Sequence, residues 1–200
     1  GLRPPSHLKG KQMASDVDIC NAALNNIGAS NIISLTEDSK AARVCNQRFG
    51  GVRDAVFRAH PWNCLIKRIE LVQGTTPVFE YAFSYPLPNE PFCLRVLEVE
   101  GEENGVVYEV EGRSIVSDEG TMRIKFISRV LDANEYDTLL IETIVARLSF
   151  EIAYSLVNSV SLQAQLFNIF ESKLKTAQFV DATEGTPSEI SSTFFTDARL

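Results

Sequence analysis

The residue pair best suited to nucleophilic chemistry is His60 and Cys64, which lie four positions apart. A histidine that accepts the proton of a nearby cysteine creates a thiolate, which is a strong nucleophile. His60 is followed by Pro61, however, and the residue before a proline disfavours the helical backbone. We therefore expect His60 to lie at a helix end and Cys64 to pack in a strand, with no catalytic role for either residue.

Other residues that could hold a metal or a cofactor form no recognisable pattern. The four cysteines include no C-x-x-C pair that could bind zinc, and we expect buried free thiols. The sequence has no phosphate loop, dinucleotide fingerprint, nucleophile elbow or H-E-x-x-H motif. We therefore expect no catalytic residue, no cofactor and no metal. A carboxylate pair suited to glycoside hydrolysis stays open, because the sequence cannot nominate two of its 26 acidic residues.

The charge balance is acidic, with 19 Lys and Arg against 26 Asp and Glu and a net charge of −7. Binding that reads DNA sequence needs cations to displace counterions from phosphates, so this balance disfavours it. Eight acidic residues fall between Glu98 and Glu119, opposed within that stretch by Arg113 alone. The stretch is either a solvated face or an acidic surface for a partner.

Hydrophobic periodicity predicts the elements that position these residues. Apolar residues recur every three or four positions over 16–27, 39–59, 133–157 and 162–179, which is typical of helices. Between 64 and 130 the period changes to two, which predicts six strands. These are Cys64–Val72, Val78–Ser84, Cys93–Gly101, Val106–Glu111, Arg113–Ser117 and Met122–Val130. The order predicts an α+β fold: a four-helix bundle with an inserted small antiparallel β-domain and an extended C-terminal tail.

Three features refine this prediction. Gly50-Gly51 inside the second helix predicts a kink or a close approach there. The basic residues of the same helix lie mostly five positions apart and form no single stripe, so we expect separate contacts with solvent or with other subunits. These residues are Lys40, Arg43, Arg48, Arg53 and Arg58. Three charges between Thr138 and Val157 favour a buried helix over a membrane span.

Composition divides the chain into four parts. Residues 1–12 differ from the rest and precede Met13, so we expect an expression-vector remnant. Residues 13–62 and 131–181 are expected to form the helical bundle, and 63–130 the inserted β-domain. Residues 182–200 have no periodicity, are rich in Ser and Thr, and carry the apolar pair Phe194-Phe195. This tail either extends the helical core or orders on a partner.

Four local patterns occur in a fixed order along Ala23–Phe49 and Asp54–Leu71. They are a helix ending in Ile27-Gly28, a Ser34-Leu35 turn, a small-residue helix with Ala41-Ala42 and Cys45, and Pro61-Trp62 before the first strand. Together they resemble the N-terminal half of phage head-to-tail adaptors, in particular the tail tubular protein A family of short-tailed phages. The segment Tyr81–Gly101 resembles a strand of the same family. Gly50-Gly51 and residues 88–93 depart from the family pattern.

The resemblance implies a structural protein of the virion, at the junction of head and tail. Family members form a ring of about twelve copies between the portal protein and the tail nozzle protein, and the ring extends the channel through which phage DNA passes without specific binding. The implied place of synthesis is the cytoplasm of the host bacterium, with no membrane association. Residues 182–200 become the candidate portal-docking tail, with Ile190, Phe194, Phe195 and Leu200 as its apolar residues. The candidate channel- or nozzle-facing acidic surface is Glu98, Glu100, Glu102, Glu103, Glu109 and Glu111.

Three other interpretations stay open. The adaptor could belong to a long-tailed phage. A tail-associated peptidoglycan hydrolase would be favoured by a carboxylate with a raised pKa in a cleft. A cytoplasmic regulatory bundle unrelated to phage would be favoured by failure to bind any portal.

Overall fold

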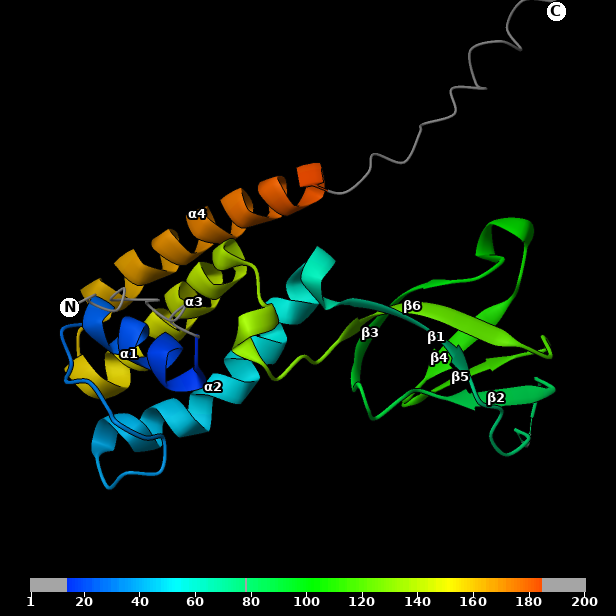
Figure 1. Ribbon diagram of the computed structural model, residues 1–200, viewed down its shortest axis with the longest axis horizontal. Coiled ribbons are helices and arrows are strands. Elements are labelled where there is room, and N and C mark those ends of the chain that lie inside the picture. Colours follow the sequence, from blue (N-terminus) through cyan, green and yellow to red (C-terminus); the bar gives the residue numbers. More distant parts are fainter. Residues whose placement is uncertain (1–13, 78, 185–200) are drawn as a thin grey trace, which may run out of the picture.

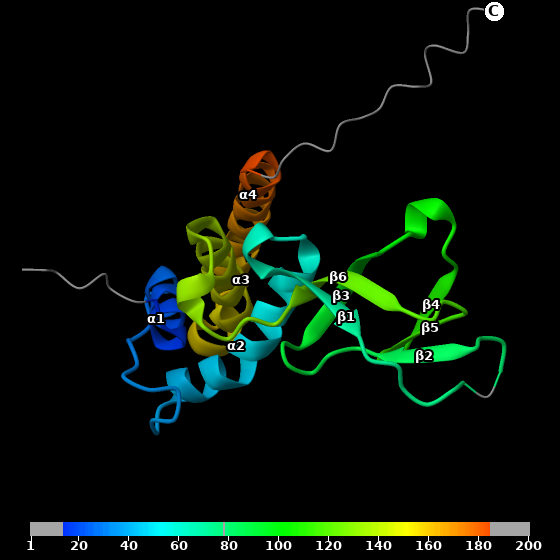
Figure 2. The ribbon, with the colours of Figure 1, turned by 45° about the vertical axis from the view of Figure 1, so that its right-hand side comes forward.

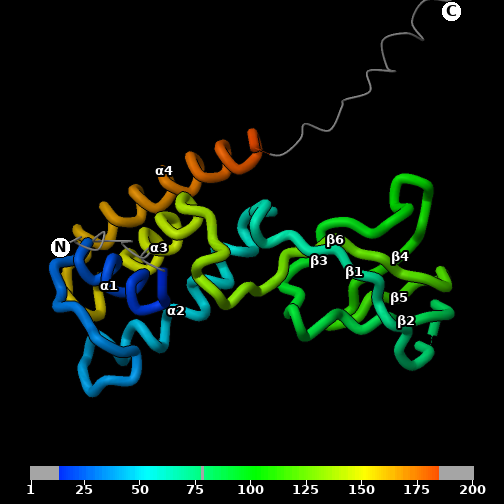
Figure 3. Tube along the Cα trace, viewed as in Figure 1, coloured from blue at the N-terminus to red at the C-terminus, as the bar shows by residue number. Residues whose placement is uncertain are grey.

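The computed structural model of the chain describes residues 14–77 and 79–184 (Figure 1). Within these ranges the helices gather at one end of an elongated molecule and the strands gather at the other end, as Figures 1 and 2 show. The chain crosses between the two ends twice, from α2 into β1 and from β6 towards α3 (Figure 3). The helices are α1 (Asp16–Asn26), α2 (Lys40–Ala59), α3 (Thr138–Val157) and α4 (Val160–Glu184).

Side-chain caps define where the first helices begin. The Ser15 hydroxyl accepts a hydrogen bond from the Asp18 amide, and the Asp18 carboxylate accepts one from the Ser15 amide, which together form a capping box. The Ser39 hydroxyl accepts from the Ala42 amide and caps α2. Gly28, in the left-handed region at φ 72°, follows the end of α1.

Helix α3 is the central element of the helical part. Its stripe of Leu140, Ile144, Leu148 and Ile152 is completely buried. Helices α1, α2 and α4 each pack along α3, whereas α1 and α2 meet over a much smaller area. The apolar surface of α3 is wide enough to accept three neighbours because apolar residues surround most of its circumference.

The strands form two separate sheets, and every strand pair is antiparallel. One sheet has the order β1-β6-β3 and the other has the order β2-β5-β4. Residues such as Tyr85, Ile115 and Phe126 fill a second hydrophobic core beside both sheets. The strands are β1 (Ile66–Leu71), β2 (Phe83–Pro86), β3 (Cys93–Val99), β4 (Tyr108–Glu111), β5 (Ser114–Ser117) and β6 (Met122–Ser128).

The predicted fold class is therefore wrong beyond its α+β character. The prediction was a four-helix bundle with one small inserted antiparallel β-domain. Residues 14–77 and 79–184 instead form four helices, three of them arranged around α3, and two three-stranded sheets. The physical reason is that periodicity reports which faces of an element are apolar, but not which element covers each face. The extended C-terminal tail, residues 185–200, lies outside the described residues.

Three predicted element boundaries are also wrong. The strand expected over Val78–Ser84 begins at Phe83, and Glu80 takes a left-handed backbone at φ 71°. The helix expected from residue 133 begins at Thr138, because Asp137 caps it by accepting a hydrogen bond from the Leu139 amide. Helix α4 continues to Glu184, so the first residues assigned to the tail are helical.

The close approach expected as one alternative at Gly50-Gly51 is not found among the described residues. Helix α2 continues through both glycines, and a Cβ added at either one would meet no atom within 4 Å among the described residues. Glycine in a helix interior lowers stability because the unfolded chain gains backbone freedom.

We expect Gly51→Ala to raise the free energy of unfolding by about 0.5–1 kcal/mol, because alanine restricts the unfolded chain and meets open space in the helix. Urea unfolding followed by circular dichroism measures this change. Gly101→Ala is the matched control: Gly101 has φ 84° and its added Cβ would lie 2.9 Å from Val106 Cγ2, so that variant should be less stable than the wild type. A destabilised Gly51→Ala variant would contradict the open-space argument.

Candidate functional site

The histidine and cysteine that could have formed a nucleophilic pair are not arranged as one. His60 Nε2 lies 2.9 Å from Asp181 Oδ2, and the His60 ring meets the Trp62 ring edge-on at 4.8 Å between centroids. Burial and the nearby Asp181 and Asp137 carboxylates raise the pKa of the Cys64 thiol. A thiol with a raised pKa is a poor nucleophile, so the chemistry of this pair is that of packing and hydrogen bonding.

Asp181 attaches the end of α4 to the end of α2. Its carboxylate is almost completely buried and accepts hydrogen bonds from His60 and from the Asn63 amide, at 3.0 Å for the latter. Its backbone carbonyl accepts a third from Asn63 Nδ2 at 2.7 Å. Trp62, also buried, donates from Nε1 to the Val56 carbonyl of α2. The last described turn of the chain is thus fixed beside the passage from α2 to β1.

The candidate docking residues follow this attachment point along the sequence. Ile190, Phe194, Phe195 and Leu200 all lie outside the described residues. The structure therefore places the start of the candidate tail and leaves the role of these four residues a prediction.

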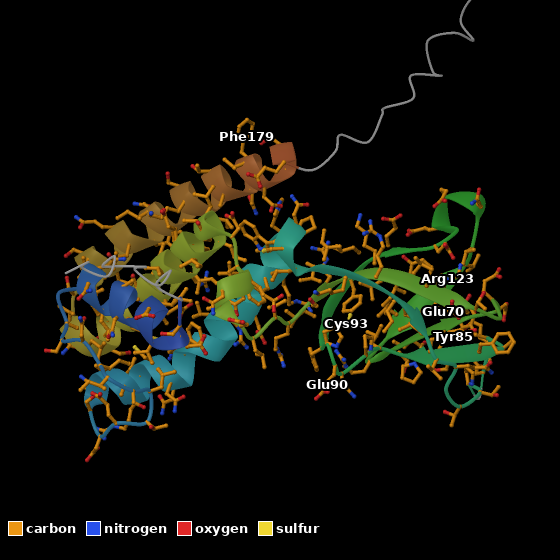
Figure 4. The ribbon with its side chains drawn as sticks, viewed as in Figure 1. Glu70, Tyr85, Glu90, Cys93, Arg123 and Phe179 are labelled. Atoms are coloured by element: carbon orange, nitrogen blue, oxygen red, sulfur yellow. The ribbon has the colours of Figure 1, made fainter. Side chains whose placement is uncertain are left out.

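The glutamates of the candidate acidic surface occupy three different places. Two of them, Glu98 and Glu100, pair with bases of the neighbouring strand β6. Lys125 Nζ lies 3.3 Å from Glu98 Oε2, and Arg123 Nη1 lies 3.0 Å from Glu100 Oε2. Arg123 also bridges to Glu70 of β1 at 2.8 Å, and both carboxylates raise its pKa (Figure 4). Charges from three strands therefore alternate across the open face of this sheet.

The other four glutamates belong to the turn after β3 and to β4. Glu102 and Glu103 belong to a 3₁₀ turn, η2 (Glu102–Asn104), and both are exposed. Glu109 and Glu111 are exposed on β4. The Tyr108 phenol has a raised pKa because of its burial and the nearby Glu102. The structure thus brings Glu102 and Glu103 together in one projecting turn, and Glu103 lines the same hollow as Glu98 and Glu100.

A basic groove lies where α2 meets the strands, and sequence reasoning missed it. The groove has a volume of about 620 Å³, and the charged residues among its mostly apolar lining are four arginines and one carboxylate. These residues are Arg58, Arg95, Arg113, Arg129 and Asp54. We name this site the arginine groove. Its arginines come from α2, β3, the turn before β5 and the residue after β6, so no local sequence pattern links them.

Phe92 fixes two of these arginines in place. The Arg113 guanidinium lies 4.0 Å from the centroid of the Phe92 ring, and the Arg129 guanidinium lies 4.1 Å from it. Arg129 also pairs with Asp54 at 2.6 Å, and Arg113 donates to the Cys93 carbonyl at 2.7 Å. Stacking and hydrogen bonding together hold both guanidinium groups in defined orientations.

Two carboxylates with opposite pKa shifts line a separate hollow of about 430 Å³. Burial raises the pKa of Asp16, against a smaller opposing effect of Arg53. Hydrogen bonds from the backbone amide and side chain of Asn134 lower the pKa of Asp132. Carboxylates whose pKa values differ in this way can divide the roles of acid and base between them.

Neither a metal cluster nor a membrane helix is found in the described part of the chain. Within residues 14–77 and 79–184, no group of three His, Cys, Asp or Glu side chains is placed to hold a metal ion. No helix of the same residues has the length and apolar character needed to cross a membrane. The cysteines at 20, 45, 64 and 93 are free thiols.

Comparison with known proteins finds no family model and no curated protein that matches this chain. The resemblance to phage head-to-tail adaptors therefore rests on the sequence pattern alone.

We expect Asp181→Ala to lower the free energy of unfolding by about 2–3 kcal/mol, because a buried hydrogen-bonded carboxylate is removed and its donors lose their partner. The last turn of α4 should also open locally, so its amides should exchange with solvent faster. Hydrogen exchange by mass spectrometry over residues 174–184 and urea unfolding measure the two effects. Glu171→Ala, at an exposed position of the same helix, is the control and should change neither. Unchanged exchange in Asp181→Ala would show that α4 does not depend on this attachment.

Proposed function

We propose that the chain is a structural protein of the virion, a head-to-tail adaptor that forms a ring between the portal and the tail nozzle. The observation that carries the proposal is the pattern shared with such adaptors along Ala23–Phe49 and Asp54–Leu71. In this chain two of the shared residues occupy structural positions: Gly28 follows the end of α1, and Trp62 is buried and donates to the Val56 carbonyl of α2. Substitutions at such positions are costly, which supports their use as family markers.

The proposed mechanism is geometric. Subunits join side by side in a ring, which needs two different contact surfaces on each subunit. The lumen continues the DNA channel, and an acidic chain suits that role because a cationic lining would retain DNA at every phosphate. The proposed partners are the portal protein, the tail nozzle protein and further copies of the chain. The proposed location is the head–tail junction of the virion, after synthesis in the bacterial cytoplasm.

The candidate docking tail should be tested by a truncation that preserves Asp181. Removing residues 185–200 leaves the attachment of Asp181 to His60 and Asn63 intact, so the truncated chain should fold. We expect the full chain to add to the portal ring of the same phage in a fixed stoichiometry. The truncated chain should bind that ring at least about tenfold more weakly, because the apolar anchors are lost. Light scattering of portal–chain mixtures measures both results.

A control and a contradicting result follow from the same assay. Phe194→Ala combined with Phe195→Ala in the full-length chain removes two large apolar side chains from the tail and should weaken binding in the same direction. Undiminished portal binding by the truncated chain would reject the docking role of the tail. Failure of the full chain to bind any portal would reject the adaptor itself.

A second candidate, a tail-associated peptidoglycan hydrolase, is favoured by one observation: Asp16 and Asp132 line the same hollow with pKa values shifted in opposite directions. Asp16 would serve as the general acid and Asp132 as the ionised partner.

If this candidate is correct, the chain should clear a suspension of purified cell walls, and Asp16→Asn should reduce the rate at least about hundredfold, because an amide cannot donate the proton. Glu171→Gln, at an exposed position outside the hollow, serves as the control and should keep most of the rate. A chain that releases no soluble glycan fragments at any pH between 4 and 8 would reject this candidate.

A further inference from the structure

The arginine groove concentrates positive charge on a protein whose net charge is negative. Arg58, Arg95, Arg113 and Arg129 surround a single carboxylate, Asp54, in a chain whose net charge is −7. Arg58 and Arg95 are exposed. Like charges repel one another when they lie close together, so a cluster of this kind is stabilised by an anionic group in the groove.

The groove is shaped for planar anions such as carboxylates. Phe92 and the Cys93 carbonyl orient Arg113, and Phe92 and Asp54 orient Arg129. A guanidinium held in one orientation presents its paired N–H groups to a carboxylate at a low entropic cost. The volume of about 620 Å³ suits a short turn of polypeptide.

An acidic turn of suitable size projects elsewhere on the same chain. In η2, Glu102 and Glu103 are exposed, and Gly101 and Gly105 flank them with φ angles of 84° and 91°. Figures 1 and 2 both show this turn at the upper edge of the strand-rich part, whereas the groove lies where α2 meets β3. We name residues 101–105 the acidic turn. One subunit cannot place its own acidic turn in its own groove, so the two surfaces can complement each other only between subunits.

We propose that the arginine groove binds the acidic turn of a second copy of this chain. The contact joins two different surfaces head to tail, and repetition of such a contact gives a closed ring or an open filament. The expectation that the ring closes rests on the proposed adaptor function. The contact between groove and turn does not depend on that function. The contact joins the four arginines of the groove on one copy to Glu102 and Glu103 on the other. The test changes Arg58 and Arg95, because both are exposed, whereas Arg113 and Arg129 also stack on Phe92.

Charge exchange tests this contact. The groove variant carries Arg58→Glu and Arg95→Glu, the turn variant carries Glu102→Arg and Glu103→Arg, and the combined variant carries all four changes. The wild type should associate with increasing concentration at low ionic strength and dissociate between about 0.05 and 0.5 M salt, because screening shortens the range of charge attraction. Each two-residue variant should associate at least about tenfold more weakly, because like charges then face each other. The combined variant, and a mixture of the groove and turn variants, should regain association.

Two control variants and a thermal unfolding measurement distinguish loss of the contact from loss of folding. Arg48→Glu with Glu171→Arg, two exposed positions outside both surfaces, is the matched control and should associate like the wild type. Arg95→Glu alone is the mildest groove variant, since Arg95 has one long hydrogen bond, of 3.4 Å, to the Arg58 carbonyl. Thermal unfolding of every variant identifies any that fails to fold. Sedimentation velocity measures association.

The outcomes are distinct. Recovery of association by the combined variant, together with its loss in each parent, establishes the contact. A wild type that stays at 22.2 kDa at every concentration and salt overturns it. If the wild type stays monomeric and binds a DNA oligonucleotide, and the groove variant does not bind it, the groove is a nucleic-acid site and the proposed contact is overturned. Portal binding by a monomeric wild type would keep the adaptor and reject the contact, whereas self-association without portal binding would keep the contact and reject the adaptor.

Discussion

The helical part of this protein depends on the burial of α3. Leu140, Ile144, Leu148 and Ile152 are completely shielded from water, and three other helices pack along the same element. Each fully buried leucine or isoleucine contributes about 1.5–3 kcal/mol relative to an exposed one. The stability of α3 and that of its neighbours therefore depend on their mutual packing. The long α4 follows α3 through a short turn at Asn158, and its far end is held separately by Asp181.

A shared core and polar contacts together orient the strands relative to the helices. One hydrophobic cluster of the described residues joins the helices to Leu94 of β3 and Ile127 of β6, and a second cluster lies among the strands. Between them lie the Asp54–Arg129 ion pair, the stacking of Arg129 and Arg113 on Phe92, and the hydrogen bond from Arg58 to the Leu94 carbonyl. The same arginines that fix the junction also line the groove, so a ligand in the groove would act directly on the contacts that orient the two parts.

Local sequence rules predicted the helices well and the sheet arrangement poorly, and the reason is the range of the interactions. The capping box of Ser15 and Asp18 and the stop at Pro61 involve residues a few positions apart, and sequence spacing reveals them. The pairing of Arg123 with both Glu70 and Glu100 requires knowledge that β6 lies between β1 and β3. The arginine groove was missed for the same reason, since its residues are distant in sequence and carry no local signature.

The net charge of this protein determines its electrostatic field at a distance. The local arrangement of charged side chains determines which surface the protein binds on contact. At physiological ionic strength the field is screened beyond about 8 Å, so an acidic chain can still present a strongly basic groove to a surface that reaches it. If a neighbouring acidic turn fills that groove, the contact removes the most basic surface of the subunit from any molecule passing nearby. Assembly would then make each subunit more uniformly acidic than it is alone. In the proposed adaptor ring this would be an advantage, because the cations proposed to hold the ring together would otherwise retain the DNA.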